Sequence, residues 1–279
     1  MKLLRFGEMG QEKPGVEING TRKDCSAHFS DWDRSFFQEG GLEKLSKIIK
    51  NESLPDIPDN TRWGSCVARP GAIICIGLNY SDHAAEAGME VPKEPIIFTK
   101  LTNTIVGPYD NVAIPKNSEK TDWEVELAIV IGKDAVYLND EEEAWNSIAG
   151  FCVMNDVSER AFQIERGGQW VKGKSCPGFS PVGPYLVTKD EINDVNNLAM
   201  KLSVNGEQKQ DGNTSTMIFK SAFLVHYLSQ FMKLEAGDII TTGTPPGVGM
   251  GFKPAQYLKK GDVVELSIEG LGTQKQKFI

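Results

Sequence analysis

Three carboxylates stand next to apolar runs in a way that suggests a cation site. Glu124 and Glu126 begin the apolar run EVELAIVIG, and Asp156 directly follows a second one, SIAGFCVMN. Alternate side chains of a strand share a face, so Glu124 and Glu126 would lie together with Cα atoms roughly 6.5–7 Å apart. Two carboxylates this close raise each other's pKa, a cost that a bound divalent cation removes. Three oxygen ligands with open positions suit Mg²⁺ or Mn²⁺.

Each carboxylate also has an ordinary structural explanation. The residues alone do not decide between that explanation and a cation site. Glu124 and Glu126 fit the solvent face of an edge strand that happens to carry glutamate. Asp156, with Glu159 three residues later, matches the pattern of a helix cap.

His83 and Glu86, in the segment NYSDHAAEAG, form a second candidate group. On a short helix capped by Ser81 or Asp82, positions three apart share a face, so Glu86 can orient the imidazole and stabilise its protonated form. Such a histidine is a candidate general base that activates water, and a surface His–Glu pair is the alternative. We also expect the glycine-flanked stretch from His83 to Met89 to close over a substrate.

Further polar side chains follow these groups along the chain. Lys174 lies in the glycine-bounded stretch VKGKSCPG, from which an ammonium can reach a developing oxyanion. Arg160 and Gln163 would point alike from a helix that follows Asp156. The loop TTGTPPGVGMGF lacks the Gly-Lys-Ser/Thr ending of a phosphate loop, so we expect its backbone and Thr244 to approach a substrate carboxylate. Solvated surface positions are the alternative for Lys174, Arg160 and Gln163.

The elements that must position these residues are mostly strands. From Gly71 onward, short β-like runs alternate with Gly, Pro, Asn and Asp turns, and two helices are expected near residues 156–166 and 216–231. Strands this frequent predict a β-rich α+β domain and not a doubly wound parallel sheet. The runs are AIICIGLNY, PIIFTK, NVAIP, EVELAIVIG, SIAGFCVMN, PVGPYLV, AMKLSVNG, DIITTG, DVVELSIEG and KQKFI.

The first part of the chain is too short to bury a core alone. It offers a strand (LLRFG), a hairpin with Asn19-Gly20 as its turn, and a helix (GLEKLSKIIK). Residues 51–70 carry three prolines and no periodicity, which is typical of a linker. We therefore predict a small N-terminal α/β domain with its linker over residues 1–65 and a larger domain over residues 70–279.

Composition narrows the class of protein. The 279 residues carry a net charge of −8 and show no cluster of Lys and Arg, which disfavours a nucleic-acid partner. No stretch approaches the roughly 20 apolar residues of a membrane span, and the opening residues do not form a secretory signal. Five cysteines without C-x-x-C spacing fit a reducing cytoplasm, where we expect the protein to work.

Six motifs in order connect the chain to a known family. They are GLNYSDHAAEAG, FTK, DWEVELAIVIGK, NDVSERAFQ, GKS and TTGTPPGVG. Together they closely resemble the fumarylacetoacetate hydrolase family from about Gly71 to the C-terminus. The resemblance implies a mixed β-sandwich roll, a homodimer, and a divalent cation, Mg²⁺ or Mn²⁺, held by Glu124, Glu126 and Asp156.

The same resemblance implies roles for the other candidates. The family's H-x-x-E dyad falls on His83 and Glu86, which would activate water, and its catalytic lysine falls on Lys174. Binding of a small 2-oxo acid substrate would fall to side chains within the matching motifs, namely Arg160, Gln163, Lys100, Tyr80 and Thr244.

Within the family, the N-terminal segment and the stretch ERGGQWVKGKS are most similar to the bacterial branch that cleaves 2,4-diketo-3-deoxy sugar acids. The expected function is metal-dependent C–C bond hydrolysis of a 2,4-diketo acid, such as a 2,4-diketo-3-deoxy-L-rhamnonate or -fuconate, to pyruvate and a hydroxy acid. Oxaloacetate decarboxylation or tautomerisation and ureidoglycolate lyase activity are alternatives on the same scaffold. A cation-dependent acid-binding protein without turnover is the alternative of another class.

Overall fold

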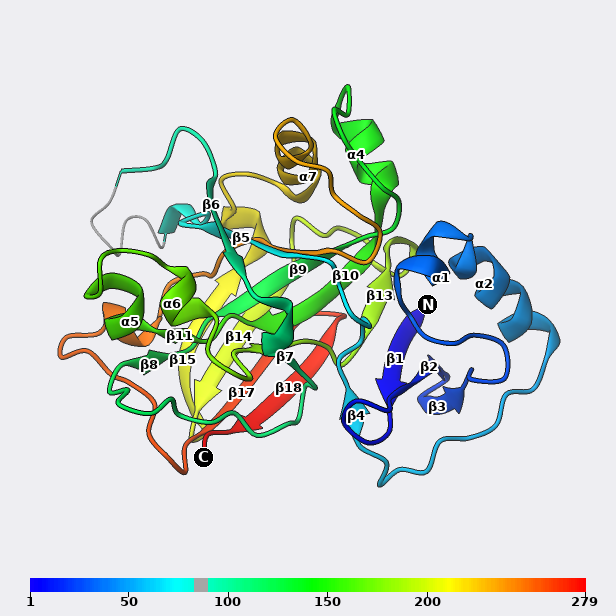
Figure 1. Cartoon of the computed structure of the whole chain (residues 1–279), viewed down its shortest axis with the longest axis horizontal. Helices are drawn as coiled ribbons and strands as arrows, with labels where there is room; N and C mark the ends of the chain where they lie inside the picture. The colour runs from blue at the N-terminus through cyan, green and yellow to red at the C-terminus, as the bar shows by residue number, and fades with distance from the viewer. Residues whose placement is uncertain (83–89) are drawn as a thin grey trace.

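The computed structural model describes residues 1–82 and 90–279, and two sheets form its centre (Figure 1). The larger sheet of the described residues has ten strands. In spatial order these are β3 (Thr21–Asp24), β2 (Lys13–Ile18), β1 (Lys2–Phe6), β13 (Leu186–Thr188), β10 (Ile148–Asn155), β9 (Val125–Ile131), β16 (Ile239–Thr241), β5 (Ile73–Gly77) and β6 (Ile96–Lys100), with β4 (Trp63–Gly64) paired to β1. The β-rich α+β prediction is confirmed.

The smaller sheet is antiparallel and has four strands among the described residues. Its order is β15 (Glu207–Asn213), β14 (Ala199–Val204), β17 (Val263–Ile268) and β18 (Gly272–Lys277). Two short pairs complete the strands, namely β8 (Thr121–Asp122) with β11 (Ser158–Glu159) and β7 (Ile105–Val106) with β12 (Ser180–Pro181).

Helices lie around the sheets and are short. They are α1 (Arg34–Gln38), α2 (Gly41–Asn51), α4 (Glu141–Ser147), α5 (Arg160–Ile164), α6 (Val171–Lys174) and α7 (Ser221–Ser229). Figure 1 shows α4 and α7 together at the top, and α1 and α2 beside the N-terminus on the right. No helix of the described residues is long and apolar enough to cross a membrane.

Apolar side chains cover both faces of the larger sheet. On β9, Val125, Leu127 and Ile129 belong to the cluster that packs against the smaller sheet. Ala128 and Val130, on the opposite face, pack with residues from the first part of the chain. The strand is therefore buried on both sides, which makes it a rigid support for the residues at its start.

The N-terminal segment extends the larger sheet. Its strand β1 pairs antiparallel with β13, and the hairpin of β2 and β3 turns at Asn19-Gly20, where both residues have positive φ, as the sequence predicted. Because the sheet and one apolar cluster run through both parts, the division of the chain between residues 65 and 70 stays a prediction.

Several element predictions are wrong in detail. The helix expected over 156–166 is reduced to α5, because residues 158–159 pair as β11, and the one expected over 216–231 is α7 alone. NVAIP forms no strand and only one bridge, from Val112 to Phe278. The elements that the sequence analysis did not predict include α4, which Asp140 caps, and β15, which is polar because it lies at the edge of its sheet.

Candidate metal centre and its cavity

Strand β9 places Glu124 and Glu126 on one face at the point where the strand begins. It lies between β10 and β16 in the middle of the larger sheet, so the edge-strand alternative is wrong. Glu124 is 6% exposed and Glu126 only 2%, while Val125 between them points into the core. The two carboxylates are thus held inside the protein by a strand that is fixed on both edges.

Asp156 joins them because β10 runs antiparallel beside β9 and ends there. Its backbone N–H donates to the Glu124 carbonyl at 2.9 Å. The helix-cap alternative is wrong, since α5 begins at Arg160 and its N-cap is Glu159. Within the described residues, Glu124, Glu126 and Asp156 each offer one oxygen, and these atoms lie within 4.8 Å of one another.

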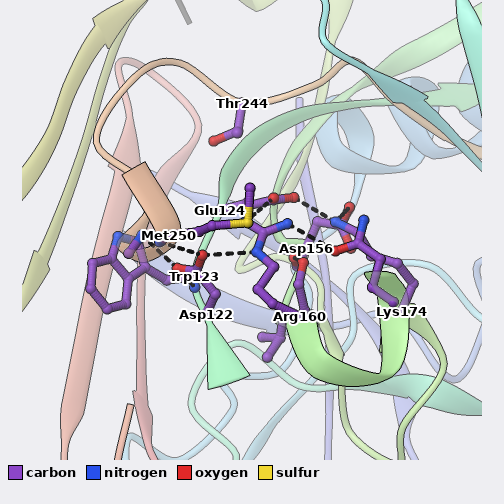
Figure 2. Close-up of polar contacts among 12 residues, drawn as sticks. Asp122, Trp123, Glu124, Asp156, Arg160, Lys174, Thr244 and Met250 are labelled. Atoms are coloured by element: carbon purple, nitrogen blue, oxygen red, sulfur yellow. Dashed lines mark hydrogen bonds and ion pairs between the residues drawn. The ribbon is translucent and has the colours of Figure 1, made fainter. Parts of the chain in front are cut away.

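Buried cations surround two of the three carboxylates (Figure 2). The Lys174 ammonium donates to Glu124 Oε2 and to Asp156 Oδ2, both at 2.6 Å. Arg160 Nη2 donates to Glu124 Oε1 at 2.6 Å, and Lys100 Nζ donates to Asp156 Oδ1. Glu126 accepts one backbone hydrogen bond, from Gly243 N at 3.0 Å, and forms no ion pair with a described residue.

This difference in partners separates the pKa values of the two glutamates. Burial alone would raise the pKa of Glu124, but Lys174 and Arg160 outweigh it and lower that pKa to about 2. For Glu126, burial and the neighbouring charges of Asp156 and Glu124 act together and raise the pKa well above its ordinary value. Burial also opposes the charge of Lys174, yet Asp156 and Glu124 outweigh it and raise the pKa of that ammonium.

The residues present fit a divalent cation. Ion pairs link three buried carboxylates to three buried cations, and Glu126 adds a fourth buried carboxylate. The carboxylates are Asp122, Glu124, Glu126 and Asp156, and the cations are Lys100, Arg160 and Lys174. Of these carboxylates, Glu126 is the one that forms no ion pair with a described residue, and it lies beside two further oxygen ligands. An all-oxygen donor set is what Mg²⁺ and Mn²⁺ prefer.

A cavity of about 580 Å³ opens at this cluster. Of the residues predicted for the site, six line it, namely Glu124, Glu126, Arg160, Gln163, Lys174 and Thr244. Arg160 Nη1 donates to Gln163 Oε1 at 3.1 Å, and no described residue accepts a hydrogen bond from Gln163 Nε2. The Gln163 amide is thus oriented with its N–H groups available to a ligand.

The remaining predicted residues lie elsewhere. Lys100 does not line the cavity but contacts Asp156 and the Val157 carbonyl behind it. Tyr80 lies in the apolar core with its hydroxyl 3.1 Å from Met200 Sδ, away from the cavity lining. The predicted base His83 and its partner Glu86, with the segment expected to close over a substrate, lie outside the described residues.

Asp122 is a functional candidate that the sequence reading missed. Its Oδ2 accepts from Arg160 Nε at 2.9 Å and from Met250 N at 3.0 Å, and its Oδ1 accepts from Gly249 N at 2.6 Å (Figure 2). It therefore connects the arginine at the metal centre to the loop that forms another wall of the cavity. A charged residue two positions before Glu124, in a stretch that becomes fully buried, is the signal that could have identified it.

Comparisons with known proteins found similar sequences and similar structures. The family described as Fumarylacetoacetate (FAA) hydrolase C-terminal matches residues 72–279. A Burkholderia multivorans protein, named provisionally as a hydrolase, is 55% identical over 278 residues, covering 99% of this chain and 98% of its own. The structure of a fumarylacetoacetate hydrolase from psychrophilic Exiguobacterium antarcticum is similar with a TM-score of 0.83 and 35% identity, covering 100% of this chain and 99% of its own. Maleylpyruvate hydrolase from Sphingobium sp. SYK-6, solved with manganese(II) and pyruvate, has a TM-score of 0.82 and 26% identity over 100% of this chain and 99% of its own.

Proposed function

The chain belongs to the fumarylacetoacetate hydrolase family, and we propose that it hydrolyses the C3–C4 bond of a 2,4-dioxo acid with the help of a divalent cation. The observation that carries this proposal is the buried group of Glu124, Glu126 and Asp156 at a cavity that also presents Lys174 and Gln163. The similar hydrolase that was solved with manganese(II) and pyruvate supports a divalent cation such as Mn²⁺ and supports pyruvate as a product.

The chemistry divides between the cation and the side chains. When bound by Glu124, Glu126 and Asp156, the cation would supply Lewis acidity toward the carboxylate and 2-oxo group of the substrate. Gln163 Nε2 and the remaining N–H groups of Arg160 bind and orient this polar end. Lys174 uses two of its three N–H groups on carboxylates, which leaves one for the oxyanion that develops at C4.

Water adds to C4 in this proposal, and the C3–C4 bond breaks. His83, oriented by Glu86, takes a proton from the water as its oxygen bonds to C4. The electron pair of the C3–C4 bond leaves with C3 as the enolate of pyruvate, which a proton at C3 converts to pyruvate. The water oxygen stays in the carboxylate of the second product.

The lining of the cavity bears on which acyl group the 2,4-dioxo acid carries. The resemblance favoured a sugar-derived substrate such as 2,4-diketo-3-deoxy-L-rhamnonate or -fuconate. The side chains beyond the carboxylates are mostly apolar, which favours a less hydroxylated group. Assembly as a homodimer also stays a prediction.

We expect the metal-depleted protein to release no pyruvate from an acylpyruvate, and Mn²⁺ or Mg²⁺ to restore release. Lactate dehydrogenase coupling measures pyruvate directly, and a chelator added to the restored protein should stop the reaction. Decarboxylation would instead yield carbon dioxide without pyruvate release from the acylpyruvate. A protein that binds the acid with the cation but never turns it over would support the acid-binding alternative and contradict the hydrolase.

Asp122→Asn is expected to lower kcat/KM by roughly 10–100-fold while Mn²⁺ still binds, because Asp122 contacts Arg160 and the loop but none of the three ligands. An amide keeps only one acceptor oxygen, so either Arg160 Nε and Met250 N lose their acceptor together, or Gly249 N loses its own. Steady-state kinetics and calorimetric Mn²⁺ titration check this, with Asp211→Asn, an exposed position on β15, as the control. Unchanged kinetics would show that Asp122 has no positioning role.

A further inference from the structure

A second cavity lies where the first part of the chain meets the larger part. Its volume is about 250 Å³, and its described lining shares no residue with the cavity at the metal centre. It is lined by Arg5 of β1, by the stretch that flanks β4, and by Ile105 and Val106 of β7 (Figure 1). Sites for drug-sized ligands measure roughly 300–1,000 Å³ and are common where two parts of a protein meet. This cavity therefore suits a smaller molecule.

Ion pairs fix one side of the second cavity. Arg5 donates to both carboxylate oxygens of Asp31, from Nε at 2.6 Å and from Nη2 at 2.9 Å. Arg62 donates from Nη1 to Glu12 Oε1 at 3.0 Å and from Nε to Asp110 Oδ1 at 2.8 Å. Separating a buried charge from its partner is costly. These two arginines are therefore already neutralised and are not available to a ligand.

Arg69 differs from these two arginines. It lines the same cavity, is exposed, and its side chain makes no ion pair or hydrogen bond with any described residue. Its φ of 47° lies in the left-handed region, which residues other than glycine rarely adopt, and the following Pro70 restricts its backbone further. Backbone strain of this kind persists only where the surrounding structure imposes it, and it is concentrated at functional sites. The fold thus keeps an unpaired guanidinium at this cavity.

The rest of the lining limits the charge and the character of a ligand. Pro70, Ile105 and Val106 contribute apolar surface. Glu12 and Asp31 also line the cavity, and although both are paired, their carboxylates would repel a second negative charge on a ligand. A ligand with one negative charge and an apolar body therefore suits the cavity better than a dianion does.

We propose that this cavity is a second binding site, which takes a small monocarboxylate with a short apolar body. The Arg69 guanidinium binds the carboxylate through two parallel hydrogen bonds, and the apolar body contacts Pro70, Ile105 and Val106. Binding at this site requires no metal ion and takes no part in bond cleavage. It is therefore independent of the proposed hydrolase function.

Isovalerate is a suitable probe, because it has one carboxylate, a branched apolar body and no 2-oxo group with which to chelate a cation. It is titrated into the full chain after chelation, and two-dimensional NMR follows the ¹⁵N-labelled backbone amides. Arg69→Asn is the variant, since asparagine tolerates left-handed backbone and keeps the local conformation. Lys260→Asn, at an exposed position outside the described lining, is the control. Malonate, a small dicarboxylate, is the second probe.

We expect isovalerate to shift the Ile105 and Val106 amides saturably and to bind wild type more tightly than malonate does. Arg69→Asn should weaken isovalerate by about 5-fold, the upper end for an exposed ion pair, and the control should not change its affinity. Because Arg69 has no partner to lose, the variant should unfold at the wild-type temperature. Shifts confined to Gly243 and Thr244 at the metal centre, tighter binding of malonate, or wild-type affinity in Arg69→Asn would overturn the proposal.

Discussion

Glu126→Gln should abolish cation-dependent turnover without destabilising the metal-free protein. Glu126 is the candidate ligand that forms no ion pair with a described residue, and burial with two neighbouring carboxylates raises its pKa. A neutral amide removes that repulsion and can still accept the hydrogen bond from Gly243 N. We therefore expect the metal-free variant to unfold at the same temperature as wild type or at a higher one.

Binding of Mn²⁺ to this variant should weaken by more than about 100-fold, because even the loss of a group behind a ligand costs roughly 10–100-fold. Differential scanning calorimetry after chelation and calorimetric titration with Mn²⁺ measure the two effects. Glu265→Gln, at an exposed position of β17, is the matched control and should change neither. Wild-type Mn²⁺ affinity in Glu126→Gln would remove this residue from the metal centre.

Asp156→Asn should abolish turnover too, but it should also destabilise the metal-free fold. Asp156 is the one described carboxylate that pairs with the buried Lys100, and it shares Lys174 with Glu124. Removing one partner of a buried ion pair leaves an uncompensated charge and typically costs about 3–5 kcal/mol. The variant should therefore unfold at a clearly lower temperature or denaturant concentration than wild type.

Comparing Glu126→Gln with Asp156→Asn shows whether the lost ion pairs cause the change in stability. Both remove one negative charge from the same candidate metal centre, so a general intolerance of the site would lower the stability of both. The structure predicts opposite behaviour, since Glu126 lacks a cationic partner among the described residues and Asp156 has two. Urea unfolding of the two variants after chelator has removed the metal decides between these cases. Equal destabilisation would contradict the difference in ion pairing between Glu126 and Asp156.

Some positions in the candidate metal centre can be predicted from the sequence, and others cannot. The common face of Glu124 and Glu126 follows from the two-residue period of a strand, and the structure agrees. The position of Asp156 beside them depends on which strands are neighbours, because Met154 on β10 pairs with Glu126 on β9. No local pattern gives that pairing, so the residues alone could not separate a ligand from a helix cap.

Tyr80 and Asp122 show the limits of reading a motif as a unit. Tyr80 follows β5 within a motif that also carries Leu78, yet Leu78 lines the cavity while Tyr80 points into the core. Residues two positions apart share a face only in an extended strand, and Leu78, just after β5, has a φ of 53° that breaks this alternation. The motif alone does not reveal which of the two residues faces the site. Asp122 went unnoticed because its partners, Arg160 and the loop at Gly249, meet only in the folded chain.

Product analysis in ¹⁸O-labelled water tests directly whether the protein hydrolyses the C3–C4 bond with the help of a cation. The Mn²⁺-loaded protein is given an acylpyruvate, and mass spectrometry follows both products. Metal-dependent hydrolysis at C4 would give equal amounts of pyruvate and of the second acid, with one ¹⁸O atom in the carboxylate of that acid, and neither product in the presence of chelator. Release of carbon dioxide in place of pyruvate, or a second acid without ¹⁸O, would contradict it.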